Sequence, residues 1–212
     1  MIQTWIADIT PLLEEERYEA YYRQLPEWRQ KKADRARQAL NKAQSVGAWT
    51  LYESMRKMYG LPDDAVYNLS HSGRYALCAV ETDLEKKAVK LGCDVEMVKE
   101  FHPGIVKRFF CPAEEEYILS YTDPEKRKEA FYRYWVLKES FIKATREGMK
   151  QDLRSFEISI EEGAPRLIRQ PEEWPEKYYY KEYQPGDADA KIAVCSTDPE
   201  FGELRITEFS GR

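Results

Sequence analysis

The sequence predicts an α+β fold with two comparable lobes. The main observation is the order of the expected elements, because helices followed by strands occur twice along the 212 residues, with a divide near residues 100–104. The composition agrees, since 13% aromatic and 33% charged residues are typical of a folded chain with a hydrated surface. We expect an N-terminal lobe over residues 1–100 and a C-terminal lobe over residues 101–212.

The first lobe is expected to open with a strand, continue with helices and close with strands. IQTWIADI (2–9) is rich in strand-forming residues, and the acidic run after it has a helical pattern. Pro26 can open the next helix because the amide hydrogen that it lacks would have no partner there. A further helix follows NKAQS and stops at YGLPDD (59–64). Strand-like runs then occupy residues 65–69, 74–80 and 88–98, separated by a turn-like SHSG (70–73) and a polar segment.

The second lobe repeats this order. A helical block is expected from about residue 102 to residue 150. Strand-like runs follow at residues 155–160, 166–169, 177–183 and 191–196, with a turn at EEGAP (161–165).

Charge and composition narrow the class of function. The net charge of -5 argues weakly against a nucleic-acid partner. No stretch approaches the roughly 20 apolar residues of a membrane span, and the N-terminus has no secretion signal, so we expect a cytoplasmic protein without a membrane partner. The four cysteines lack CxxC spacing, which favours reduced thiols. With only two histidines, a metal ion here is expected to be a hard cation held by carboxylates.

Two carboxylates share one face of the strand LGCDVEM (91–97). Alternation places Asp94 and Glu96 on the same side, roughly 6.5–7 Å apart, where both can approach one divalent cation. Gly92 on that side leaves room for a ligand. The alternative is an exposed acidic strand face.

A second acidic group lies on the expected helix RYWVLKESFIKATREGM (133–149). Trp135, Glu139 and Lys143 form a stripe at the edge of its apolar face, and Lys138 falls on that face. The alternative is a surface Glu–Lys pair with a Lys138 that extends its ammonium to solvent.

Two further segments offer groups for phosphate. NLSHSG (68–73) supplies hydroxyl and imidazole donors, and RQKKADRAR (29–37) gathers cations in an acidic chain. A polar turn and a solvated helix face are the competing interpretations.

Taken together, the carboxylates and the phosphate-binding groups favour Mg²⁺-assisted chemistry on a phosphate or pyrophosphate. An unrelated Mg²⁺ phosphohydrolase lacks support, because no sequence feature positions a hydrolytic water.

Four ordered blocks carry a family resemblance. They are NLSHSG (68–73), GCDVE (92–96), KRFFCPAEEEY (107–117) and FYRYWVLKESFIKATREGM (131–149). The paired acids followed by the W-x-x-K-E-x-x-x-K pattern make the chain resemble the Sfp-type 4′-phosphopantetheinyl transferases. The resemblance implies a pseudo-twofold pair of similar α/β lobes, each a small, mainly antiparallel sheet packed with helices. It also implies a monomeric holo-[carrier protein] synthase, which transfers the 4′-phosphopantetheine arm of coenzyme A to a serine of an apo carrier protein and releases adenosine 3′,5′-bisphosphate.

The resemblance also implies roles for individual residues. Asp94, Glu96 and Glu139 correspond to Mg²⁺ ligands, and Lys143 to the lysine that stabilises charge on the pyrophosphate. Glu139, directly or through a water, is the candidate base, and Glu96 is the alternative. The residues that correspond to coenzyme A contacts are Lys32, Arg35, Ser70, His71, Lys138 and Lys143. The carrier protein, whether acyl, peptidyl or aryl, is expected to dock at an apolar surface with basic neighbours that includes Val98, Arg108, Phe109 and Phe110. The alternative for Phe109 and Phe110, equally weighted, is that they belong to the core.

Two departures from the family pattern support a second hypothesis. Gln44 stands where family members commonly carry an arginine, and a strand with a Gly-Lys-Pro-type motif is missing before NLSHSG. The alternative function is therefore a non-catalytic homologue that binds coenzyme A or a carrier protein.

Overall fold

The structure is a computed structural model that describes residues 1–148, 152–160, 163–186 and 189–209. The helical elements are η1 (Thr10–Leu13), α1 (Glu15–Tyr22), α2 (Glu27–Asp34), α3 (Ala39–Tyr59), α4 (Gly104–Phe109), α5 (Pro112–Ser120), α6 (Pro124–Thr145) and η3 (Leu153–Ser155). The strands are β1 (Ile2–Asp8), β2 (Tyr67–Ser72), β3 (Tyr75–Glu81), β4 (Leu91–Met97), β5 (Glu157–Ser159), β6 (Arg166–Arg169), β7 (Tyr179–Tyr183), β8 (Ala190–Ser196) and β9 (Phe201–Glu208).

Two main sheets form the centre of the molecule. The first has the strand order β2-β3-β1-β9 and the second has the order β4-β8-β7, with β5 and β6 as a separate pair. All neighbouring strands are antiparallel except β1 and β9, which are parallel. The predicted class, α+β with small, mainly antiparallel sheets packed with helices, is confirmed.

Strand pairing does not follow the division expected at residue 100. β4 belongs to the sheet of β7 and β8, and β9, which the sequence pattern did not predict, joins β1 in the first sheet. Each half of the chain therefore contributes a strand to the sheet of the other half. The division into two lobes stays a prediction.

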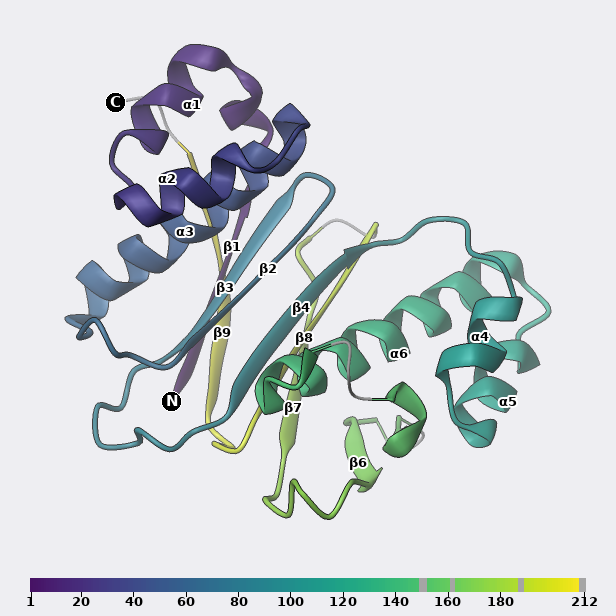
Figure 1. The fold of residues 1–212 in the computed structure, drawn as a ribbon. Coiled ribbons are helices and arrows are strands. Elements are labelled where there is room, and N and C mark those ends of the chain that lie inside the picture. The colour runs from purple at the N-terminus through teal and green to yellow at the C-terminus, as the bar shows by residue number, and fades with distance from the viewer. Residues whose placement is uncertain (149–151, 161–162, 187–188, 210–212) are drawn as a thin grey trace.

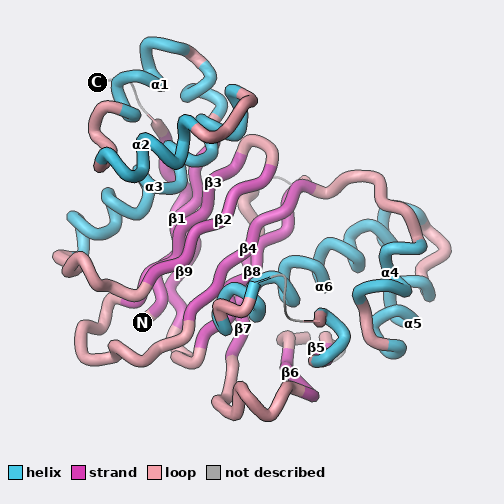
Figure 2. Tube along the Cα trace, viewed as in Figure 1, coloured by secondary structure: helices cyan, strands magenta, loops and turns pink. Residues whose placement is uncertain are grey.

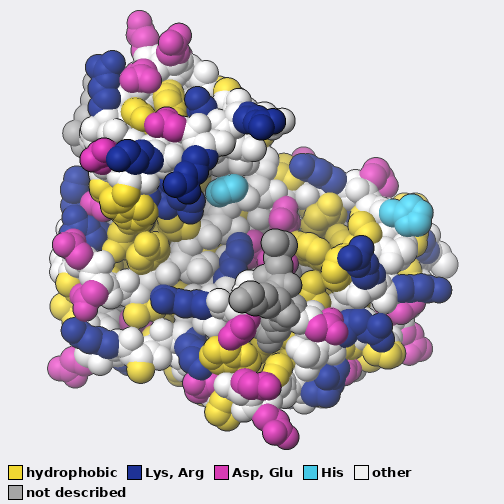
Figure 3. Space-filling model, viewed as in Figure 1, with side chains coloured by type: hydrophobic (Ala, Val, Ile, Leu, Met, Phe, Trp, Pro, Cys, Tyr) yellow, Lys and Arg dark blue, Asp and Glu magenta, His cyan; other side chains and the backbone are white. Residues whose placement is uncertain are grey.

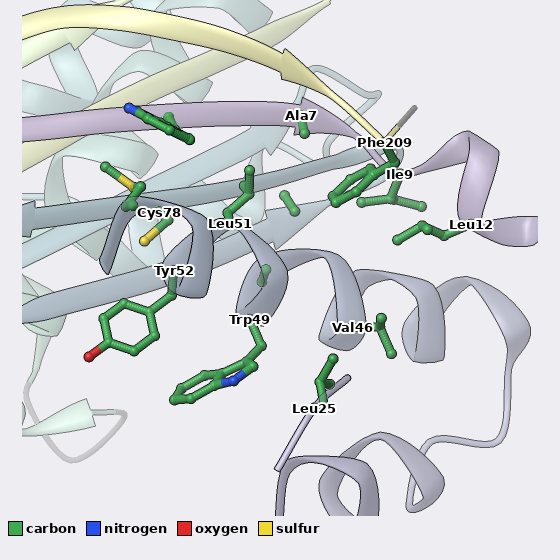
Figure 4. Close-up of a cluster of buried hydrophobic side chains, with 14 of the residues drawn as sticks. Ala7, Ile9, Leu12, Leu25, Val46, Trp49, Leu51, Tyr52, Cys78 and Phe209 are labelled. Atoms are coloured by element: carbon green, nitrogen blue, oxygen red, sulfur yellow. The ribbon is translucent and has the colours of Figure 1, made fainter. Parts of the chain in front are cut away.

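The long helices α3 and α6 cover different sheets, as Figures 1 and 2 show. α3 packs on the first sheet around a core that includes Ile9, Leu51 and Cys78 (Figure 4). α6 packs on the second sheet through a separate core. A third core lies between the strands of the two sheets and contains Ile6, Leu77, Cys93 and Val194, among others. The strand β4 therefore has one side toward the first sheet and the other toward α6.

Local sequence explains how the long helices begin and end. α6 begins after Asp123, whose side chain accepts a hydrogen bond from the amide of Glu125, with Pro124 in the first turn. α3 ends at Gly60, which adopts a left-handed conformation at φ 63° that costs glycine little. α6 extends further toward the N-terminus than the pattern indicated and stops at Thr145, and Met149 lies outside the described residues.

Other predictions are corrected or stay open. Ser70, His71 and Ser72 lie in β2 and not in a turn, which the chain makes only at Gly73 and Arg74. Residues 161–162 of the expected EEGAP turn lie outside the described residues. All four cysteines are free and buried, as expected of reduced thiols. Within the described ranges, no helix has both the length and the apolar character needed to cross a membrane.

Candidate active site

The strands β2 and β4 are joined by side chains and not by backbone pairing. Alternate residues of β2 accept hydrogen bonds from alternate backbone amides of β4. These bonds run from Cys93 N to Asn68 Oδ1 at 3.0 Å, from Val95 N to Ser70 Oγ at 3.3 Å and from Met97 N to Ser72 Oγ at 3.2 Å. Both strands repeat every two residues, so the register stays constant along the contact. The open edge of β4 is thereby satisfied and the two sheets are tied together.

The two serines of this contact also orient the carboxylates of β4. Ser70 Oγ donates to Asp94 Oδ1 at 2.8 Å, and Ser72 Oγ donates to Glu96 Oε2 at 2.6 Å. Ser70 additionally accepts from Lys143 Nζ at 2.9 Å. A hydroxyl has one proton and two lone pairs, so the Ser70 hydroxyl is fully used. The hydroxyl holds Asp94 and Lys143 in place, and its contact with a coenzyme A phosphate stays a prediction.

Lys143 reaches this cluster because α6 lies close against β4. Lys143 Nζ lies 2.6 Å from Asp94 Oδ1. Gly92 permits the approach, since a Cβ there would lie 2.0 Å from the carbonyl oxygen of Ser140 and 2.4 Å from the amide of Ala144. The predicted room for a ligand beside Gly92 is thus wrong, because the backbone of α6 fills it.

The cluster holds more negative charge than Lys143 can balance. Burial, reinforced by Asp94, raises the pKa of Glu139, and burial raises the pKa of Asp94 and of Glu96 as well. Burial alone would lower the pKa of Lys143, but Asp94 and Glu139 outweigh it and raise the pKa. Asp94 Oδ2 is buried and has no hydrogen-bond partner among the described residues. The site therefore has capacity for further positive charge.

The composition of the cluster fits a hard cation, although its present arrangement is incomplete. Carboxylate oxygens are the ligands that Mg²⁺ prefers. A cation would give the unpartnered Asp94 Oδ2 a partner and would balance the surplus negative charge. Within residues 1–148, 152–160, 163–186 and 189–209, however, no three acidic, histidine or cysteine side chains are arranged as ligands of one ion. Asp94 Oδ1 and Glu96 Oε2 are held by Lys143 and Ser72, so binding would require these side chains to turn.

Basic groups from α2 lie near the cluster at His71. Part of the His71 side chain is exposed to solvent. Desolvation by the surrounding protein and the positive charges of Lys143 and Lys32 lower its pKa. Desolvation and Arg29 lower the pKa of Lys32. Arg35 is the C-cap of α2 and is exposed. The fold therefore brings Lys32 within electrostatic reach of His71.

Lys138 lies elsewhere, and its assignment to coenzyme A is corrected. Its side chain is fully buried, 2.9 Å from Glu114 Oε2, and Nζ donates to the carbonyl oxygens of Leu153 and Phe156. Glu114 in turn accepts from the backbone amides of Cys111 and Ile158. Five positions separate Lys138 from Lys143, which places them on different faces of α6. Lys138 therefore joins α6 to α5 and η3.

The expected carrier surface is only partly exposed. Phe110 is 1% exposed and belongs to the core around α6, so its predicted contact with a carrier is wrong. Phe109 is half-buried, edge-on to Trp135, and Arg108 is exposed with its guanidinium 5.1 Å from the Phe109 ring. Val98 is half-buried.

Gln44 has a structural role. Its side chain is buried, and Nε2 donates to the carbonyl oxygen of Gly73 at 2.7 Å. It therefore ties α3 to the turn between β2 and β3. Sequence reasoning missed this contact, and it also missed the role of Asn68 and Ser72. The alternation of Asn, Ser and Ser in YNLSHS was the available signal, but a turn had been expected there.

Comparison with known proteins identifies the family. The model of the 4′-phosphopantetheinyl transferase superfamily matches residues 90–195, which is half of the chain and contains Asp94, Glu96, Glu139 and Lys143. The chain belongs to this superfamily.

Individual relatives carry the same description. The chain is 34% identical over 145 residues to the 4′-phosphopantetheinyl transferase Sfp of Bacillus subtilis, covering 68% of this chain and 61% of the relative. It is 35% identical over 111 residues to the 4′-phosphopantetheinyl transferase HetI of Nostoc, covering 51% of this chain and 44% of that protein. A crystal structure of holo-[acyl-carrier-protein] synthase from Thermotoga maritima has a TM-score of 0.43 and 19% identity, covering 50% of this chain and 61% of that one. The chain thus spans less than two thirds of the length of these relatives.

Proposed function

We propose that the protein transfers the 4′-phosphopantetheine arm of coenzyme A to a serine of an apo carrier protein, in the cytoplasm and as a monomer. The observation that carries the proposal is the cluster at the contact of β2, β4 and α6, where Lys143 meets Asp94 at 2.6 Å beside Glu96 and Glu139. Family membership supports it, as does the description of the relatives as phosphopantetheinyl transferases.

Asp94, Glu96 and Glu139 would hold Mg²⁺. When bound, the ion would neutralise charge on the pyrophosphate of coenzyme A. The excess carboxylate charge and the free Asp94 Oδ2 support this assignment.

The residues of the chain supply the remaining functions. The serine oxygen of the carrier forms a bond to the β-phosphorus, and the bond from that phosphorus to the bridging oxygen breaks, releasing adenosine 3′,5′-bisphosphate. The ammonium of Lys143 stabilises negative charge on the phosphate oxygens and is the candidate proton donor to the leaving group. Glu139, directly or through a water, is proposed to accept the serine proton on a carboxylate oxygen that Mg²⁺ leaves free. Glu96 is the alternative base.

Lys32, Arg35 and His71 are the proposed contacts for the phosphates of coenzyme A. The proximity of Lys32 to His71 supports this placement. The carrier protein is proposed to dock near Val98, Arg108 and the exposed edge of Phe109.

The transfer is tested by incubating the protein with coenzyme A, Mg²⁺ and an apo carrier protein. The carrier should gain the mass of the phosphopantetheine arm. Glu139→Gln should lower the rate by about 10²–10³-fold, a loss typical of removing one group that stabilises a transition state. Glu116→Gln on the exposed side of α5 is the control and should retain the rate. No mass gain with several carriers, under conditions where a known transferase succeeds, contradicts the proposal.

Metal binding has its own test that does not depend on transfer. Mg²⁺ at 100 times its dissociation constant should stabilise the folded protein by about 2.7 kcal/mol, which thermal unfolding detects. The stabilisation should shrink in Glu139→Gln and remain in Glu116→Gln. Equal stabilisation of both variants would place the ion elsewhere.

The alternative is a homologue that binds coenzyme A or a carrier without transfer. The buried hydrogen bond of Gln44 to Gly73 favours it, because this side chain offers no charge to a phosphate. It predicts carrier binding without a mass gain, and binding that Glu139→Gln leaves unchanged.

A further inference from the structure

A lysine ammonium satisfies one oxygen of the carboxylate that is proposed to bind Mg²⁺. Asp94 Oδ1 accepts hydrogen bonds from Lys143 Nζ at 2.6 Å and from Ser70 Oγ at 2.8 Å. A carboxylate oxygen has two lone pairs, so these two donors use both of them. The other oxygen, Asp94 Oδ2, is buried and has no hydrogen-bond partner among the described residues. A cation that binds Asp94 therefore shares this carboxylate with the ammonium of Lys143.

Burial distinguishes this pair from the ion pairs of the surface. Basic and acidic side chains lie beside one another over much of the face that Figure 3 shows. One exposed pair of the chain joins Lys31 to Glu27, whose side chains are 68% and 79% exposed. The side chain of Asp94 is 4% exposed and that of Lys143 is 27% exposed. Water screens the exposed pair far more than the buried one, so charges beside Asp94 act strongly on one another.

The packing of α6 against β4 fixes the backbone of Lys143. A Cβ on Gly92 would lie 2.9 Å from the carbonyl carbon of Lys143, so no space separates the helix from the strand. The side chain of Lys143 is long and partly exposed, and it can therefore rotate toward solvent while the helix stays in place. The ammonium can leave Asp94 by a side-chain rotation alone.

We propose that the Lys143 ammonium competes with Mg²⁺ for Asp94 and leaves this carboxylate when the metal binds, so that the lysine limits the affinity of the site for Mg²⁺. The physical reason is that two positive charges on one buried carboxylate repel each other. Once displaced, the ammonium is available to the phosphate oxygens, which is the role that the proposed function gives it. This inference rests on the proposed function, since it describes how the same metal site is regulated.

The test measures Mg²⁺ binding without coenzyme A or a carrier protein. Lys143→Met removes the competing charge, so calorimetric titration should give a dissociation constant for Mg²⁺ about tenfold lower than that of the unsubstituted protein. Lys143→Arg keeps the positive charge and should keep the affinity of the unsubstituted protein. Lys126→Met makes the same change at an exposed position of the same helix, and this control should also bind Mg²⁺ as the unsubstituted protein does.

Two results of this titration overturn the inference. Unchanged or weaker Mg²⁺ binding by Lys143→Met would mean that the lysine does not compete with the metal. An equal gain of affinity in Lys143→Met and Lys126→Met would mean that the gain comes from the net charge of the chain and not from the place of Lys143.

A second measurement uses the unsubstituted protein and so does not depend on the folding of a variant. Acetylation with an amine-reactive ester, followed by peptide mass spectrometry, reports how accessible each lysine side chain is. Saturating Mg²⁺ should increase the acetylation rate of Lys143 severalfold, because the ammonium is released from Asp94, and should leave the rate of Lys126 unchanged. A Lys143 rate that Mg²⁺ leaves unchanged or lowers overturns the inference.

Failure of this inference is distinguishable from failure of the proposed function. If Lys143→Met binds Mg²⁺ more tightly but the unsubstituted protein modifies no carrier, the competition stands and the transfer proposal falls. If transfer succeeds while Lys143→Met binds Mg²⁺ no more tightly than the unsubstituted protein, transfer stands and the competition falls.

Discussion

Two lysines of α6, Lys138 and Lys143, are both paired with a carboxylate, but their surroundings differ. The Lys138–Glu114 pair is balanced, and backbone groups satisfy both partners on the remaining sides. The Lys143–Asp94 pair lies among surplus carboxylates, and Asp94 Oδ2 has no partner among the described residues. We call the Lys138–Glu114 pair saturated, because all of its charges and hydrogen-bonding groups have partners, and it can only support the fold. We call the Lys143–Asp94 pair and its neighbouring carboxylates unsaturated, because they have charge and lone pairs left for a ligand.

The largest expected effect comes from breaking the saturated pair. Lys138→Met leaves the buried Glu114 carboxylate without a counter-charge, which should lower the free energy of unfolding by about 3–5 kcal/mol in urea denaturation. The double variant Lys138→Met, Glu114→Gln should recover part of this loss. Lys126→Met on the exposed start of α6 is the control. A loss no larger than that of the control would show that the pair does not stabilise the fold.

The next largest effect tests how the unsaturated pair is assembled. Gly92→Ala places a Cβ against the backbone of α6, so the helix must move away from β4. We expect a loss of about 1–3 kcal/mol in unfolding free energy and, because Lys143 moves away from Asp94, weaker transfer. An active, fully stable Gly92→Ala protein contradicts the close contact.

A smaller effect of opposite sign should come from the unsaturated cluster. Glu139→Gln removes a charge that burial and the neighbouring Asp94 and Glu96 disfavour, so the unfolding free energy without Mg²⁺ should rise by about 1 kcal/mol while the transfer rate falls by about 10²–10³-fold. Glu116→Gln should change neither quantity. Destabilisation by Glu139→Gln would mean that Glu139 supports the fold, as Lys138 does.

The smallest effect is the pH dependence of that difference. The pKa of Glu139 is raised in the folded state, so ionisation opposes folding at pH values above it. The stability gap between Glu139→Gln and the unsubstituted protein should therefore be largest at pH values above the folded-state pKa of Glu139. It should close as the pH falls through the folded-state pKa toward the unfolded value of about 4.3. Denaturation curves at several pH values measure the gap, and a gap that widens in acid would reverse the assigned direction of the shift.

The sequence by itself determined the features that depend on short-range periodicity. Alternation along β4 placed Asp94 and Glu96 together, the helical repeat placed Glu139 and Lys143 on one stripe, and the order of elements indicated the α+β class. These patterns are local because backbone geometry fixes them within one strand or helix. They identified the carboxylates and the lysine of the candidate site.

Only the tertiary structure decided which distant segments meet. Periodicity placed Lys138 on the apolar face of α6, but only the packing of α5 supplied Glu114 and made it a buried ion pair. The sequence indicated space for a ligand beside Gly92, but the backbone of α6 occupies that space. Ser70 and Ser72 of β2, which the sequence placed in a turn, accept hydrogen bonds from backbone amides of β4. The strand β9 pairs with β1. Such contacts depend on pairing across the chain, which no local pattern specifies.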